Sequence, residues 1–182
     1  MLYNLFNLVV DLVGGLFAGV LLLRFWMQIV RVRPPQQIAQ FTFQLTDWLV
    51  KPLRRVIPGV GGIDWASILA AYAIALICSL LKVWMLLRLF SSLIFLLALF
   101  SLLQWIIYGW TAILILEVIF SWVNPHAPLA PFVQALNAPM LKPIRRVIPL
   151  LGGLDLSPMV LFLLLQVASR TLAYASMMLT GI

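Results

Sequence analysis

A motif of fourteen residues occurs twice in this chain, and a long apolar run follows each copy. Residues 51–64 read K-P-L-R-R-V-I-P-G-V-G-G-I-D and residues 142–155 read K-P-I-R-R-V-I-P-L-L-G-G-L-D, with ten of the fourteen positions identical. Internal similarity of this kind indicates that one structural unit has been duplicated. We therefore expect two tandem repeats, 1–90 and 91–182.

Four apolar segments are long enough to cross a lipid bilayer. Hydrophobic residues make up 64% of the chain and charged residues 9%, which is more apolar surface than a soluble domain of this length could bury. In lipid, backbone groups must be hydrogen-bonded within a helix, and about 20 apolar residues span the hydrocarbon core. We predict an all-α integral membrane protein whose four transmembrane helices cover about residues 5–30, 65–87, 93–123 and 156–179.

The third segment is longer than a perpendicular crossing requires, and tilt or projection beyond the bilayer accommodates the surplus. A hairpin around Tyr108 and Gly109 is the alternative, which is disfavoured because neither half would cross the bilayer. The first segment lacks the cationic region and cleavage site of a secretory signal, so we expect it to be retained.

Basic residues are concentrated in the two long connections inside the repeats, at 31–63 and 124–155. By the positive-inside rule, both loops are cytoplasmic and both chain ends lie outside. The repeats are then two helical hairpins of the same topology, related by a pseudo-twofold axis along the membrane normal.

Each of these loops begins with an amphipathic segment, at about 36–50 and about 129–141. The apolar residues fall on one helical face. They are Ile38, Phe41, Leu45 and Trp48 in the first segment and Leu129, Phe132, Val133, Leu136 and Met140 in the second. We predict two cytoplasmic helices that lie in the membrane interface.

The motif combines helix breakers with a basic couple. We expect the prolines to end or begin helices, the glycines to let the chain re-enter the membrane, and each aspartate to cap the next span. These structural positions are Pro52, Pro58, Gly61, Gly62 and Asp64 in the first copy, and Pro143, Pro149, Gly152, Gly153 and Asp155 in the second. The basic positions are Lys51, Arg54, Arg55, Lys142, Arg145 and Arg146.

Two interpretations of the basic positions are open. The simpler one is that they bind anionic lipid headgroups, at about 1 kcal/mol per basic residue. The other is that the pseudo-twofold axis joins both copies into one basic plate that docks an acidic partner or phosphate.

Charges inside the spans are costly and require a partner or a purpose. Arg24 and Glu117 each lie seven residues before the end of the first span of their repeat, so we expect them at the same depth. We predict an ion pair between them across the first and third spans. The alternative is that Arg24 reaches the headgroups while Glu117 finds a polar neighbour.

A third acidic residue, Asp11, is expected near the external interface. It could pair with Lys82 or Arg170, although contact with headgroups would also explain both cations.

The sequence carries no enzyme signature. The single histidine, His126, and the single cysteine, Cys78, lack the further ligands that a metal or haem site requires. We expect neither catalysis nor a cofactor. The net charge of +7 lies beside the spans, so lipid phosphate is a nearer partner than nucleic acid. No row of acidic residues crosses the membrane, which gives transport little support.

The repeated P-x-R-R-V-I-P-x-x-G-G-x-D resembles the YggT family of bacterial and plastid membrane proteins. Leu22-Leu23-Arg24-Phe25-Trp26 in the first span and Phe120-Ser121-Trp122-Val123 at the end of the third add to the resemblance. It implies a multi-pass protein of the bacterial inner membrane. Relatives are associated with osmotic stress tolerance, with cell division and nucleoid distribution, or with cytochrome b6 maturation.

From the residues and the resemblance together we expect a non-enzymatic scaffold or assembly factor. It would recruit a membrane or cytoplasmic protein partner and bind anionic lipid, and it could form a homo-oligomer. The alternative is a component of an ion-flux or osmotic-stress transport system.

Overall fold

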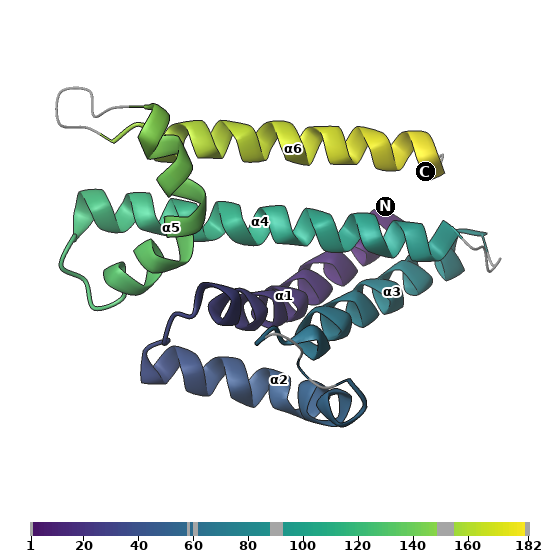
Figure 1. Ribbon diagram of the computed structural model, residues 1–182. Helices are drawn as coiled ribbons and strands as arrows, with labels where there is room; N and C mark the ends of the chain where they lie inside the picture. Colours follow the sequence, from purple (N-terminus) through teal and green to yellow (C-terminus); the bar gives the residue numbers. More distant parts are fainter. Residues whose placement is uncertain (1, 58, 60–61, 88–92, 149–154, 181–182) are drawn as a thin grey trace.

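The computed structural model is all-helical over the residues that it describes, which are 2–57, 59, 62–87, 93–148 and 155–180. Within those residues six helices follow one another: α1 Leu2–Val30, α2 Gln36–Val56, α3 Trp65–Leu87, α4 Leu93–Val123, α5 Ala130–Val147 and α6 Ser157–Thr180. α1, α3, α4 and α6 form a bundle, and α2 and α5 pack beside the end where α4 finishes and α6 begins (Figure 1).

The four bundle helices are the apolar ones. Each contains a segment long and apolar enough to cross a membrane, at 5–30, 65–84, 93–123 and 157–179, which confirms the four expected spans. α4 is one continuous helix, so a hairpin around Tyr108 and Gly109 is ruled out. At 1.5 Å per residue, α4 is about 46 Å long, which exceeds the roughly 30 Å hydrocarbon core.

Small side chains let α1 and α3 approach closely. A Cβ atom placed on Gly14 would collide with Sγ of Cys78 and lie 3.1 Å from the ring of Trp105. On α3, Ala66, Ala70, Ala71 and Ala75 are fully or almost fully buried in the same cluster. Close backbone approach at small residues is the usual basis of helix packing in lipid, where no hydrophobic effect drives helices together.

The second repeat packs differently. Leu114, Leu141, Leu161 and Leu165 form its buried cluster, where α4, α5 and α6 meet. Larger side chains interdigitate there instead of small ones meeting backbone to backbone.

α2 and α5 bury unlike faces. α2 turns Thr42, Thr46 and Val50 toward the bundle and leaves Phe41 and Trp48 57% and 65% exposed. α5 instead buries Val133 and Leu136, two residues of its apolar face, within the protein. Only the first of the two helices therefore presents large apolar side chains away from the bundle in the way that the sequence pattern suggested.

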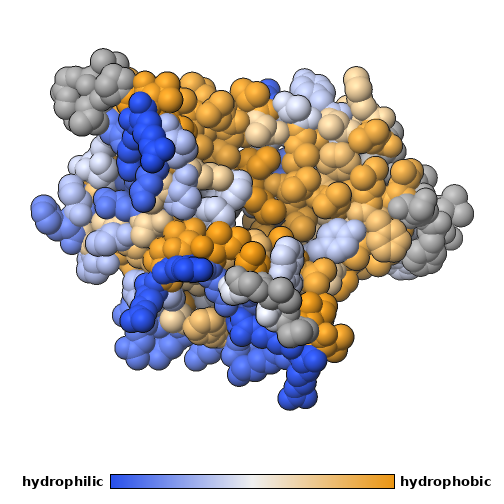
Figure 2. Space-filling view, viewed as in Figure 1, coloured by the Kyte–Doolittle hydropathy of each residue, from blue (hydrophilic) through white to orange (hydrophobic). Residues whose placement is uncertain are grey.

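Hydrophilic residues gather over α2 and α5, whereas the surface of the long helices is mostly apolar (Figure 2). We call the α2 and α5 side, together with the adjoining ends of the bundle helices, the basic end. Both copies of the motif lie there.

Candidate functional site

The first copy of the motif closes on itself through an ion pair. Arg54, in the last turn of α2, donates from Nη2 to Oδ2 of Asp64 at 2.5 Å and from Nε to Oδ1 at 3.1 Å. This two-point geometry makes arginine–carboxylate pairs specific. Between the two residues Gly62 has a φ of 77°, a left-handed conformation that favours glycine. The end of α2 is thereby tied to the start of α3.

Arg24 joins this cluster from inside the bundle. Its side chain is only 4% exposed. Nη1 donates to Oγ1 of Thr46 at 2.7 Å and to Oδ1 of Asp47 at 2.8 Å, while Nε lies 3.6 Å from Oδ2 of Asp64. The guanidinium also lies 4.9 Å from the ring centroid of Phe43. Two carboxylates therefore balance the buried charge of Arg24.

The carboxylates of the first cluster are held in the ionised form. The hydrogen bond from Lys51 is the largest cause that lowers the pKa of Asp47. Burial alone would raise the pKa of Asp64, but hydrogen bonds from Arg54 and Ser67 outweigh burial and hold this pKa below its ordinary value of 3.8. Both carboxylates are consequently ionised at neutral pH.

The second copy closes in the same way, but its arginine is shared. Nε of Arg145 donates to Oδ2 of Asp155 at 2.7 Å, and Nη2 donates to Oε1 of Glu117 at 3.3 Å. Oδ1 of Asp155 accepts from the backbone N–H of Ser157 at 2.9 Å, so this aspartate caps α6 as expected. Burial raises the pKa of Asp155, but the bonds from Ser157 and Arg145 outweigh it and lower the pKa below 3.8.

Among the buried charges at the basic end, Glu117 is the more weakly compensated one. Its residue is 5% exposed, and Oε2 has no hydrogen-bond partner among the described residues. The nearby α5 contributes Asn137, which is 3% exposed and donates to the backbone oxygen of Ile113 at 3.1 Å. Glu117 has a long contact with Arg145 and a hydrogen bond from Asn137, so its buried charge is only partly compensated.

The predicted ion pair between Arg24 and Glu117 is therefore wrong. Each residue faces the motif of its own repeat and not the other repeat. Near Arg24, Trp26 makes a contact between the repeats: its Nε1 donates to the backbone oxygen of Leu136 at 3.0 Å, and its ring centroid lies 5.2 Å from that of Trp110.

The six basic residues of the motif divide into two groups. Arg54 and Arg145 bind the aspartates while their side chains stay 41% and 43% exposed. Arg55, Arg146 and Lys142 are exposed and make no ion pair with a described carboxylate. Lys51 is 72% exposed and pairs with Asp47 at 2.9 Å within α2. Three of the six basic residues are thus at the surface without an ion pair to a described carboxylate.

The prolines at the start of each motif do not end helices. Pro52 and Pro143 lie inside α2 and α5, which run on to Val56 and Val147 instead of stopping near 50 and 141. A proline removes one helical hydrogen bond and bends the helix, but a helix held by contacts beyond that point continues. The remaining structural positions, Pro58, Gly61, Pro149, Gly152 and Gly153, lie outside the described residues.

Asp47 and Thr46 were missed as partners of Arg24. A usable signal was present, because Thr42 and Thr46 are spaced by four residues and so share one helical face. Oγ1 of Thr46 both accepts from Arg24 and donates to the backbone oxygen of Thr42.

The chemistry of the two clusters is that of ion pairs. In the part of the chain that the structure describes, no group of three or more His, Cys, Asp or Glu residues could hold a metal ion. The clusters connect α2 to α1 and α3, and α5 to α4 and α6, and they leave a fixed set of cations outside.

Comparison with known proteins shows relatives along nearly the whole chain. The family model described as CCB3/YggT matches residues 3–95 and again 96–176. "Uncharacterized protein YggT" of Escherichia coli is 38% identical over 175 residues, covering 93% of this chain and 90% of its own length. An uncharacterized protein of Vibrio alginolyticus is 36% identical over 175 residues, covering 91% of this chain and 92% of its own.

No solved structure matches the chain. The two family matches fall on the two repeats that the duplicated motif indicated. The chain therefore belongs to the CCB3/YggT family.

Proposed function

We propose that this protein is a non-enzymatic scaffold of the bacterial inner membrane, which recruits a partner or anionic lipid through cations fixed at its basic end. The observation that carries the proposal is the division of each arginine couple. One member binds an aspartate at the start of the next span, and the other is exposed one residue further on. A cation on a helix end that is tied in place loses less entropy on binding than one on a free loop.

In this proposal the chain forms two tandem hairpins of the same topology. The surplus of Lys and Arg at the basic end supports a cytoplasmic location for α2 and α5, with the chain ends outside. The exposed Phe41 and Trp48 support insertion of α2 into the headgroup region. Reporter fusions after residue 182 and within 124–129 test the orientation, and activity on the same side would contradict it.

Partner recruitment is tested by neutralising the outer arginines. We expect Arg55→Gln with Arg146→Gln to abolish copurification of a partner crosslinked in native membranes, or to weaken binding to vesicles containing phosphatidylglycerol. The matched control is Arg31→Gln with Arg33→Gln, which removes two exposed charges from the first loop outside the motif. If both double variants lose the same amount of binding, the motif has no special role and the proposal fails.

One observation favours the alternative, a component of an ion-flux system. Glu117 is a buried carboxylate in an apolar helix with one oxygen unpartnered among the described residues, which is a common feature of ion pathways. Flux of K⁺, Na⁺ or protons through the pure protein in liposomes, lost in Glu117→Gln, would overturn the scaffold and establish this function.

A further inference from the structure

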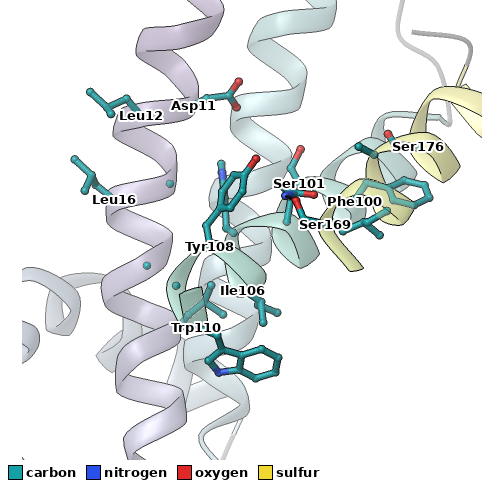
Figure 3. Close-up of a pocket in the computed structure, with 18 of the residues that line it drawn as sticks. Asp11, Leu12, Leu16, Phe100, Ser101, Ile106, Tyr108, Trp110, Ser169 and Ser176 are labelled. Atoms are coloured by element: carbon teal, nitrogen blue, oxygen red, sulfur yellow. Dashed lines mark hydrogen bonds between the residues drawn. The ribbon is translucent and has the colours of Figure 1, made fainter. Parts of the chain in front are cut away.

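A long groove lies between α1 and α6 and runs along the bundle as far as Trp26 and Ile113, which contact α5. α4 contacts both of these helices, but the described parts of α1 and α6 do not contact each other, so α4 forms the floor. The groove has a volume of about 1400 Å³. Figure 3 looks into it, with Leu12 and Leu16 on α1, Tyr108 and Trp110 on α4, and Ser169 on α6.

Most of the groove wall is apolar. Polar side chains line one side of it, beginning at the end away from the basic end and reaching toward the middle of the bundle. Nε2 of Gln104 donates to Oγ of Ser169 at 2.5 Å, which joins α4 to α6. Gln104 lies about 16 Å along α4 from its start at Leu93, roughly half the thickness of the hydrocarbon core. Polar groups therefore reach the middle of the membrane-crossing region.

The groove carries one uncompensated positive charge. Lys82 and Asp11, which line its outer part, form an ion pair with each other. Arg170 follows Ser169 on α6 and lines the same groove, yet no described carboxylate lies within ion-pair distance of it. Of the three charges, two cancel and that of Arg170 is left.

Arg170 is poorly placed to reach the membrane surface. It lies about 20 Å along α6 from Ser157 and about 15 Å from the helix end at Thr180, in the outer half of the span. Side chains on a helix tilt toward the helix N-terminus, which for α6 is the more distant basic end. A cation held at this depth is expensive unless an anion accompanies it.

We propose that this groove binds one anionic phospholipid from the surrounding membrane, with its phosphate on Arg170 and its acyl chains along α1 and α4. The volume exceeds the roughly 300–1,000 Å³ of a pocket for a drug-sized ligand, as a lipid with two chains requires. Ser169 and Gln104 line the same groove and supply further hydrogen-bonding groups, and a guanidinium makes strong charge-assisted hydrogen bonds to phosphate oxygens.

The test is titration of the full-length protein in detergent with phosphatidylglycerol, and with phosphatidylethanolamine of the same acyl chains, followed by native mass spectrometry. We expect one phosphatidylglycerol to bind at least about tenfold more tightly than phosphatidylethanolamine, because both carry the phosphate but the ammonium group of phosphatidylethanolamine opposes the charge of Arg170. Arg170→Gln removes this preference and Arg170→Lys keeps most of it. The matched control Arg33→Gln, an exposed charge removed outside the motif, leaves the preference unchanged.

A second variant fills the groove without changing its charge. A Cβ atom on Gly19 meets no atom within 4 Å, and Gly19 lines the groove, so Gly19→Leu starts from open space and adds volume there. We expect this variant to keep the wild-type melting temperature or exceed it, and to lose binding of both lipids.

Three outcomes would overturn the proposal. The first is equal binding of the two lipids by the wild-type protein. The second is undiminished phosphatidylglycerol binding by Gly19→Leu or by Arg170→Gln. The third is a dimer that dissociates in Arg170→Gln and excludes lipid, which would assign the groove to a second copy of the chain.

Discussion

The two repeats carry the same motif but surround it with opposite charge. In the first, Asp64 lies between two arginines, Arg54 and Arg24. In the second, Arg145 lies between two carboxylates, Asp155 and Glu117. The shared arginine–aspartate pair therefore tolerates a third charge of either sign.

The two repeats differ in how completely the charges of Arg24 and Glu117 are balanced by their neighbours. Arg24 contacts Asp47 and Asp64 and also Thr46, whereas Glu117 has Arg145 at 3.3 Å and a hydrogen bond from Asn137. The first cluster thus behaves as an ionic lock with two carboxylates around Arg24, and in the second Glu117 shares one arginine with Asp155. A duplicated motif can therefore keep its fold while one copy is freed for another role.

We expect the removal of Arg24, the centre of the ionic lock, to have the largest effect on stability. Arg24→Leu leaves Asp47 and Asp64 without their buried partner, and breaking a buried pair from one side costs about 3–5 kcal/mol. We expect a loss of that size in the free energy of unfolding in detergent micelles. Thermal melting of the purified variant measures it, and a loss below about 1 kcal/mol would refute the lock.

The same substitution at the two equivalent arginines should have unequal effects. Arg145→Gln leaves two carboxylates without a cation, whereas after Arg54→Gln the residue Asp64 still has Arg24 and Ser67. Because both arginines are more than 40% exposed, solvent screening reduces the cost, and we expect about 2 kcal/mol for the former and about 1 kcal/mol for the latter. Equal losses in chemical unfolding would remove the distinction between the repeats.

Glu117→Gln should cost little. The amide keeps the shape and can still accept from Arg145, while the penalty of a poorly paired buried charge is removed. We expect a change within about 1 kcal/mol, in either direction. A destabilisation as large as that of Arg24→Leu would mean that Glu117 is as well compensated as Arg24, contrary to the contacts in the structure.

The smallest expected effect concerns the stability of the protein at acidic pH. The pKa values of Asp64 and Asp155 lie below 3.8 in the folded protein, so their stabilisation is complete above that pH and is lost as pH falls through the folded values. We expect Asp64→Asn to flatten the fall of melting temperature below pH 4 more than Asp155→Asn, since Asp64 has more charged partners. Identical acid profiles would contradict this order.

The spans could be predicted because their cause is local. Hydropathy and helix length alone located α1, α3, α4 and α6, and the identical motif residues located the repeats. The division of the arginine couple could not be predicted. Both arginines of each couple are adjacent in the chain, and which one meets the aspartate depends on the direction of the last turn of α2 or α5.

The partners of the intramembrane charges were equally out of reach. Equal spacing from the span ends put Arg24 and Glu117 in equivalent places, and both do lie against the motif of their repeat. The spacing did not specify how α1 and α4 are rotated about their axes. This rotation decides which side chains meet across the repeats, and Trp26 is one of them.

The sequence by itself determined that this chain is a duplicated, four-span helical protein of the CCB3/YggT family, because apolar length and repeated residues are properties of the chain. Only the tertiary structure decided that Arg24 meets two carboxylates while Glu117 shares one arginine with Asp155, and that Arg170 lines a groove. The sign and distance of a charge's neighbours depend on how helices far apart in the chain pack together.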